Sequence, residues 1–144
     1  VPIGAFMVTE RANSLTFGDH GSTFGGNALT TAAARSVVEF AINENLPEKV
    51  RVSGQKLKNN LLNLAKADYS NITEIRGEGL LIAIQFETEI GLEVMQECFN
   101  RGLLVNRVRP DTVRLMPPLI VSDEDIDKGS AIISEAVHAV SKEK

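Results

Sequence analysis

Apolar residues recur every three or four positions in four segments of the chain, and this spacing predicts four helices. Asn27 is a suitable N-cap for the first helix, and Gly102 suits the position just after the third. Ser122 with Asp125 three residues later forms an acidic variant of the capping box. The predicted helices run from residue 28 to a stop between 43 and 47, from 47 to about 67, from about 89 to 101, and from about 122 to 140.

Short apolar runs between these helices predict strands at residues 1–8, 72–75, 80–86, 103–105 and 113–116. Asp68, Tyr69, Ser70 and Asn71 predict a turn, and Arg107, Arg109 and Asp111 predict a charged, solvated turn. Helices and short strands alternate after Pro47, which indicates an α/β layer with a domain boundary between residues 43 and 47.

Composition narrows the functional classes without naming one. The chain has 144 residues, of which 43% are hydrophobic and 24% charged, and this suits one domain or pieces of two. A net charge of -4 supplies no basic patch, so we expect no nucleic-acid partner. No apolar run approaches the ~18 residues of a membrane span, so we expect no membrane partner.

The single cysteine, Cys98, excludes an intrachain disulfide and favours a cytoplasmic protein. No set of His, Cys, Asp and Glu has metal-ligand spacing, so we expect no metal.

The most distinctive stretch is residues 20–27, which read His-Gly-Ser-Thr-Phe-Gly-Gly-Asn. Backbone N–H groups, two hydroxyls and a helix N-terminus can converge there on one anion, which makes the loop a candidate phosphate site. A tight turn that feeds a capped helix needs the same residues, and from the loop alone both interpretations stand.

Residues 20–27, together with Val-Pro-Ile-Gly-Ala at 1–5, closely resemble the class III (ornithine-type) aminotransferases, which use pyridoxal 5'-phosphate. Arg-Gly-Glu-Gly-Leu at 76–80 and Val-Arg-Leu-Met-Pro-Pro-Leu at 113–119 are similar to two further family signatures in the expected order. The pattern between residues 102 and 127 is most similar to the bacterial acetylornithine enzymes. The resemblance implies part of a fold-type I α/β transferase. Residues 1–46 would end the large cofactor-binding domain, and residues 47–144 would form the small C-terminal domain.

The resemblance also implies an activity. The parent enzyme would move an amino group between N-acetylornithine, or a related ω-amino donor, and the 2-oxo acid 2-oxoglutarate in arginine biosynthesis. It would be a homodimer whose subunits share the active site. The chain would begin just after the lysine that carries the cofactor, so we expect it to be inactive alone. Ornithine, succinylornithine and 4-aminobutyrate aminotransferases share much of the pattern, and a non-catalytic assembly module is the alternative from another class.

By the same resemblance, Ser22 and Thr23 bind the cofactor phosphate of the neighbouring subunit, and Arg114 binds the substrate α-carboxylate. A hydroxyl donates a hydrogen bond to phosphate without adding charge, and a guanidinium donates two parallel bonds to a carboxylate. The alternative for Arg114 is the solvated face of an edge strand. We interpret Arg76 as a member of a structural ion pair and His20 as a loop or interface residue. No residue here is assigned to the catalytic steps themselves.

Overall fold

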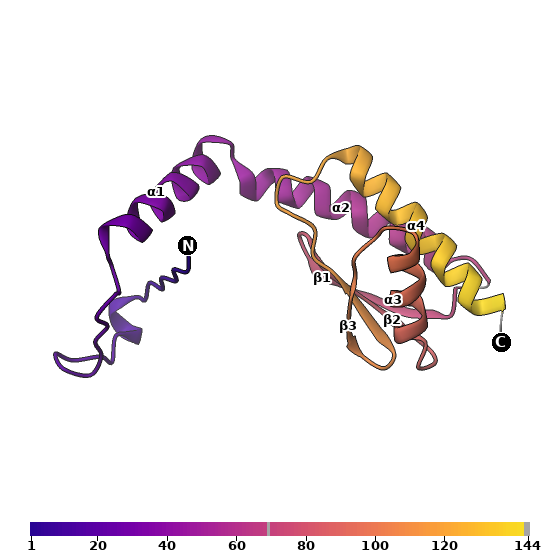
Figure 1. Cartoon of the computed structure of the whole chain (residues 1–144), viewed down its shortest axis with the longest axis horizontal. Coiled ribbons are helices and arrows are strands. Elements are labelled where there is room, and N and C mark those ends of the chain that lie inside the picture. The colour runs from indigo at the N-terminus through magenta and orange to yellow at the C-terminus, as the bar shows by residue number, and fades with distance from the viewer. Residues whose placement is uncertain (69, 143–144) are drawn as a thin grey trace. The chain divides into compact units, whose positions relative to one another are not determined.

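The computed structural model describes residues 1–68 and 70–142. The chain divides into two compact units, Val1–Asn45 and Leu46–Lys144 (Figure 1). The first unit contains a short 3-10 helix, η1 (Glu10–Ala12), and the helix α1 (Ala28–Asn43). That residues 1–46 end a large domain and residues 47–144 form a small C-terminal domain stays a prediction.

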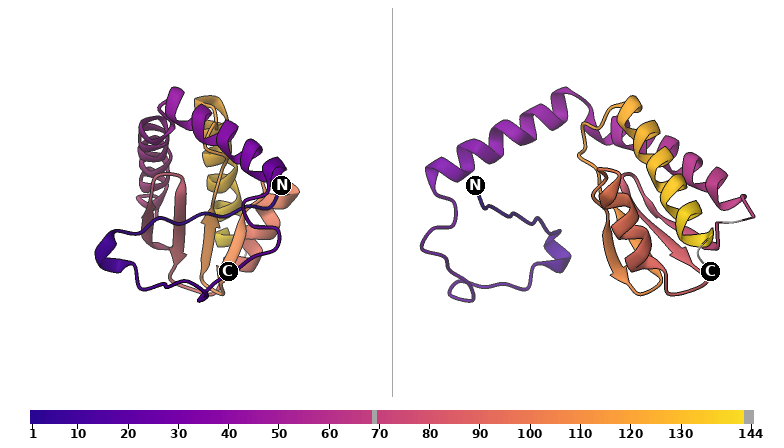
Figure 2. Two further views of the ribbon diagram at one scale, coloured as in Figure 1. Left: turned by 90° about the vertical axis from the view of Figure 1, so that its left-hand side faces the viewer. Right: turned by 45° about the vertical axis from the view of Figure 1, so that its right-hand side comes forward.

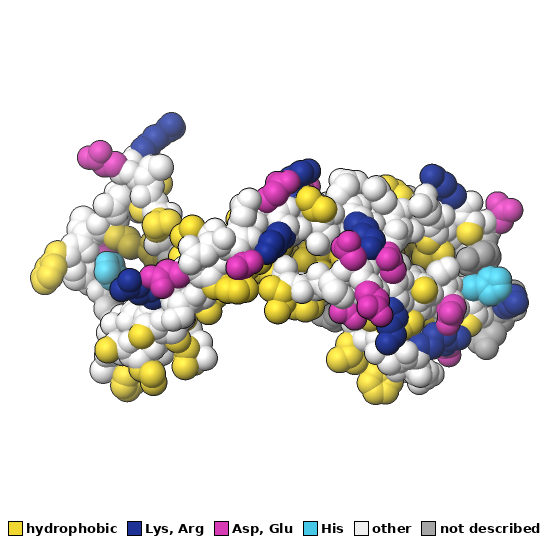
Figure 3. Space-filling view, turned by 90° about the horizontal axis from the view of Figure 1, so that it is seen from above, with side chains coloured by type: hydrophobic (Ala, Val, Ile, Leu, Met, Phe, Trp, Pro, Cys, Tyr) yellow, Lys and Arg dark blue, Asp and Glu magenta, His cyan; other side chains and the backbone are white. Residues whose placement is uncertain are grey.

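The first unit contains no strand among its described residues, so the predicted strand at residues 1–8 is wrong. A strand needs a neighbour to pair its backbone N–H and C=O groups, and this unit supplies none. None of the residues of α1 is buried. Met7 and Phe24, for example, are 97% and 81% exposed. Figure 3 shows hydrophobic side chains of this unit, in yellow, at its surface. Surfaces of this kind are typical of a segment that is covered by other protein.

The N-terminus of α1 is capped as the sequence predicts. The Asn27 side chain accepts a hydrogen bond from the backbone N–H of Thr30 at 3.1 Å. The hydroxyl of Thr31 donates to the Asn27 carbonyl at 2.8 Å. The first bond pairs an N–H group that an uncapped helix would leave unpaired, and both bonds fix the end of the glycine-rich loop.

The second unit is a four-stranded antiparallel sheet in the order β1-β2-β4-β3, with three helices packed against one face (Figure 2). Its buried core joins Leu61 of one helix to Ile84 and Val113 of the sheet. The elements are α2 (Leu46–Ala65), β1 (Ile72–Glu78), β2 (Leu81–Phe86), α3 (Gly91–Asn100), β3 (Asn106–Arg109), β4 (Thr112–Leu115) and α4 (Asp123–Lys142).

The third strand differs from the prediction. Residues 103–105 form no strand, and the polar run Asn106–Arg109 forms β3 instead. The predicted charged turn is therefore wrong for Arg107 and Arg109, which lie in β3, and the hairpin turns at Pro110 and Asp111. An edge strand with every residue exposed has no hydrophobic pattern, whereas proline and aspartate are the usual residues of a tight turn. Tyr69, part of the other predicted turn, lies outside the described residues.

Specific polar contacts cap helix α4 and hold it against helix α2. Ser122 accepts a hydrogen bond from the backbone N–H of Asp125 at 3.0 Å, which confirms the predicted cap of α4. Lys56 of α2 contacts Asp127 of α4 at 2.9 Å. The hydrogen bond from Lys56, followed by one from Asn60, lowers the pKa of the Asp127 carboxyl. These contacts fix α2 against α4.

Helix α2 approaches the turn between β1 and β2 at Gly54. A Cβ atom at this position would lie 2.2 Å from the carbonyl oxygen of Gly79, much closer than van der Waals contact allows. Gly54 is therefore required by the packing of helix against backbone, although glycine lowers helix propensity.

Cys98 is fully buried on α3, as the sequence suggests for a residue that packs like a small apolar side chain. Burial raises the pKa of its thiol to about 11, so the group stays neutral at ordinary pH. Across residues 1–68 and 70–142, each helix is too short or too polar to cross a membrane.

Candidate functional site

The glycine-rich loop forms a compact turn before α1. The backbone N–H of Gly25 donates a hydrogen bond to the Ser22 hydroxyl oxygen at 2.9 Å. A Cβ atom at Gly25 would lie 2.9 Å from the same oxygen, so only glycine fits there without a shift of Ser22. Gly26 has φ +69°, a backbone conformation that glycine adopts readily. The turn-and-cap interpretation therefore describes the geometry of the loop.

That geometry leaves hydroxyl groups available to a ligand. Thr23 is exposed, and its hydroxyl makes no hydrogen bond within residues 1–68 and 70–142. The Ser22 hydroxyl accepts a bond through its oxygen and keeps its own hydrogen free to donate. Two neutral donors beside a helix N-terminus suit a phosphate group, so these residues fit the phosphate of pyridoxal phosphate.

Arg114 lies on β4, an interior strand between β2 and β3, so its predicted alternative position on an edge strand is wrong. The side chain is half-buried. Its Nε is buried and has no hydrogen-bond partner among the described residues. Buried guanidinium nitrogens are normally paired, and an unpaired one is expected where a ligand or another polypeptide supplies the acceptor.

The face of the sheet that carries Arg114 is polar. Val113 and Leu115, its neighbours on β4, are buried and belong to the core under the helices. Successive residues of a strand point to opposite faces, so Arg114 points away from the helices. Arg76 lies on the same face and donates to Glu74 and to Gln85, at 2.7 Å each. The predicted ion pair of Arg76 is confirmed.

Hydrogen bonds continue from Gln85 across this face. Gln85 Nε2 donates to the Asp111 carboxylate at 3.2 Å, and the hydroxyl of the buried Thr112 donates to the same carboxylate at 2.8 Å. The network links β1, β2 and the turn before β4, and it ends at Thr112, two residues before Arg114 on β4. Analysis of the sequence alone missed Gln85 and Asp111, since only strand register brings them together.

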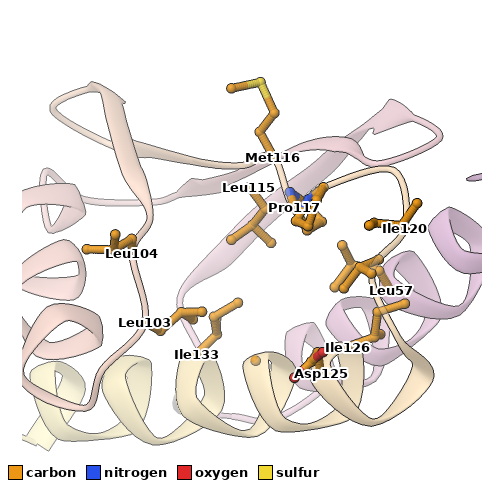
Figure 4. A pocket seen from close by; sticks show the side chains of 13 residues that line it. Leu57, Leu103, Leu104, Leu115, Met116, Pro117, Ile120, Asp125, Ile126 and Ile133 are labelled. Carbon is orange, nitrogen blue, oxygen red and sulfur yellow. The ribbon is translucent and has the colours of Figure 1, made fainter. Parts of the chain in front are cut away.

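An apolar hollow of the second unit is a separate feature. Its volume is about 610 Å³, and it lies between α4, the end of β4 and the segment that precedes β3 (Figure 4). Leu103, Leu115, Met116 and Ile133 are among its lining residues, whereas Arg114 is not. An ionised carboxylate would lose its hydration there without gaining a partner, so this cavity does not suit the substrate.

The structure therefore places the predicted site residues in two groups. Ser22 and Thr23 lie in the first unit, and Arg114 lies in the second. His20 is exposed and begins the same loop of the first unit, two residues before Ser22. Within the described parts of the chain, no three His, Cys, Asp or Glu side chains are arranged to hold a metal ion.

The family model named Aminotransferase class-III matches residues 1–137, so the chain belongs to the class III aminotransferases. The acetylornithine aminotransferase of Thermosynechococcus vestitus is 43% identical over 140 residues, which cover 95% of this chain and 34% of that protein. The mitochondrial acetylornithine aminotransferase of Alnus glutinosa is 33% identical over 144 residues, which cover 99% of this chain and 32% of that protein. The chain thus spans about a third of the length of the curated relatives it matches.

Solved structures agree on the fold. The ornithine δ-aminotransferase of Plasmodium falciparum superimposes with a TM-score of 0.80 at 35% identity, over 89% of this chain and 33% of that chain. The lysine aminotransferase of M. tuberculosis gives a TM-score of 0.79 at 31% identity, over 85% of this chain and 28% of that chain. The predicted fold, part of a fold-type I transferase, is confirmed.

Proposed function

We propose that this chain is the C-terminal part of a cytoplasmic, pyridoxal-phosphate-dependent aminotransferase that exchanges an amino group between N-acetylornithine and 2-oxoglutarate in arginine biosynthesis. Residues 1–46 would end its large domain, and residues 47–144 would form its small domain. The names of the curated relatives that the chain matches support the choice of N-acetylornithine.

The observation that carries this proposal is the unpaired, buried Nε of Arg114 on an interior strand. A carboxylate is the natural partner of such a group, because its two oxygens match the two parallel N–H donors of a guanidinium. In the proposed reaction, Arg114 holds the α-carboxylate and so fixes the substrate's orientation. Removing that freedom of rotation is a large part of what a positioning group contributes to rate.

Ser22 and Thr23 have a different role in this proposal. Pyridoxal phosphate, when bound, supplies the electron sink for amino-group transfer. The two hydroxyls donate hydrogen bonds to its phosphate and so anchor it against release. We assign this contact to the neighbouring subunit's cofactor in a homodimer. The exposed apolar side chains of the first unit support an assembly that covers them.

The substrate assignment predicts a rank order of amino donors. The full-length enzyme should form glutamate from 2-oxoglutarate, with a higher kcat/KM for N-acetylornithine than for ornithine, succinylornithine, lysine or 4-aminobutyrate. Coupled assays of glutamate with each donor measure this order. A higher value for another donor would move the assignment to that substrate. The absence of any donor-dependent glutamate would overturn the proposed activity.

The phosphate assignment predicts that Thr23→Val weakens cofactor binding. Valine keeps the shape of threonine but removes the donor, and one hydrogen bond to a charged group contributes about 1.5–3 kcal/mol. We therefore expect cofactor affinity in the dimer to fall roughly ten- to a hundredfold, measured by equilibrium dialysis. Thr73→Val on β1 is the matched control, because the Thr73 hydroxyl donates to the Gln85 carbonyl within the second unit. Equal cofactor affinity in wild type and Thr23→Val would leave the loop as a turn and cap alone.

A further inference from the structure

Four residues form a row across the polar face of the sheet. Arg76 pairs with Ala83, Ala83 pairs with Arg114, and Arg114 pairs with Asn106 of β3. Directly opposite residues of antiparallel strands point to the same face, with Cβ atoms about 4.5–5.5 Å apart. The side chains of Arg114 and Asn106 are therefore neighbours on the face away from the helices.

The two ends of this row differ in hydrogen bonding. Arg76 is already bonded to Glu74 and Gln85, so its charge is neutralised within the sheet. At the other end, the exposed Asn106 makes no side-chain hydrogen bond to any residue of the described chain. Arg114 beside it has its buried Nε unpaired. The two side chains whose donors are left for a ligand, those of Arg114 and Asn106, are thus adjacent at the end of the row nearest β3.

Ala83 gives this arrangement its shape. It lies between the two arginines in the row and carries only a methyl group, so it offers no hydrogen-bond acceptor to the guanidinium of Arg114. A ligand carboxylate that lies over β4 can meet the guanidinium of Arg114 and lie within reach of the Asn106 amide on the neighbouring strand β3. An amide that donates to an anion adds a hydrogen bond without adding charge.

The geometry points to Asn106 as a second carboxylate-binding residue, whose Nδ2–H donates to the same substrate α-carboxylate that Arg114 holds. This inference rests on the proposed function of Arg114. It assigns to Asn106 a part of the affinity for both the amino donor and the 2-oxo acid, since both present an α-carboxylate. Arg76, bonded within the sheet, has no part in it.

Glutarate is a suitable probe, because it carries carboxylates but has neither an amino nor an oxo group to react. Calorimetric titration of the full-length holoenzyme should give a glutarate Kd that Asn106→Ala raises roughly tenfold, the effect of one hydrogen bond to a charged group. Asn106→Asp should raise the Kd further, because it places a like charge beside the ligand. The KM for 2-oxoglutarate should rise in the same order. Asn59→Ala is the matched control, an exposed asparagine on α2 far along the chain from this strand.

The outcomes separate the two assignments. Arg114→Ala could weaken glutarate binding while Asn106→Ala and Asn106→Asp bind glutarate as wild type does. This result would overturn the role of Asn106 and leave the proposed function intact. Wild-type binding in Arg114→Ala would overturn the carboxylate site itself. Unchanged thermal unfolding of Asn106→Ala is expected, since the side chain is exposed, and it ties any loss of binding to the ligand.

Discussion

Arg114→Ala in the full-length enzyme is expected to lower kcat/KM by roughly thirty- to several-thousandfold, for the amino donor and for 2-oxoglutarate alike. Truncation leaves the substrate carboxylate without its charged partner, a loss on the order of 2–5 kcal/mol. Arg114→Lys should recover only part of the activity, because an ammonium group cannot form two parallel hydrogen bonds to a carboxylate. Steady-state kinetics with each substrate varied in turn measures both effects.

Cofactor content is the internal control of this experiment, because Arg114 is assigned to the substrate and should leave bound pyridoxal phosphate unchanged. Arg51→Ala is the matched variant, since the Arg51 side chain is 65% exposed and pairs with Glu48 on the surface of α2. Surface pairs of this kind contribute about 0–1 kcal/mol to stability, so this variant should behave as wild type. Wild-type kcat/KM for both substrates in Arg114→Ala would return Arg114 to a structural role.

Local sequence signals predicted the helices well. The spacing of apolar residues and the caps at Asn27 and Ser122 lie close together in the sequence, so they can be recognised without tertiary structure. The observed α1 begins at Ala28, directly after its predicted cap. By contrast, β3 was missed because an edge strand with both faces exposed needs no apolar alternation.

The candidate site depended on information that is not local. The composition of residues 113–116 predicted a strand, but the order β1-β2-β4-β3 decides that Arg114 lies in the interior of the sheet. Register likewise brings Asn106 beside Arg114 and Gln85 beside Thr112. A single sequence contains no direct record of such pairings, and the resemblance to a family supplied the role of Arg114 without its surroundings.

Gly54→Ala is the second substitution with a large expected effect, and two physical terms oppose each other there. Alanine in place of glycine stabilises a helix by about 0.8–1 kcal/mol. The new Cβ, however, would lie 2.2 Å from the Gly79 oxygen and 2.4 Å from its carbonyl carbon. These are backbone atoms of a turn in which Gly79 has φ +55°, so no flexible side chain can move aside.

Helix α2 must therefore shift away from the sheet, and overpacking of this kind costs about 1–3 kcal/mol, occasionally more. We expect the overlap to prevail, with a net loss of up to about 2 kcal/mol and a fall in Tm of up to roughly 8–16 °C for a unit of this size. Gly129→Ala on α4 is the matched control, because its nearest neighbour would be a Leu103 methyl carbon at an ordinary 3.7 Å. That variant should gain about 0.5–1 kcal/mol from helix propensity.

Urea and thermal unfolding of the 144-residue chain, followed by circular dichroism, compare the effects of Gly54→Ala and Gly129→Ala directly. If both variants were stabilised alike, α2 would not approach the β1–β2 turn as closely as the structure has it.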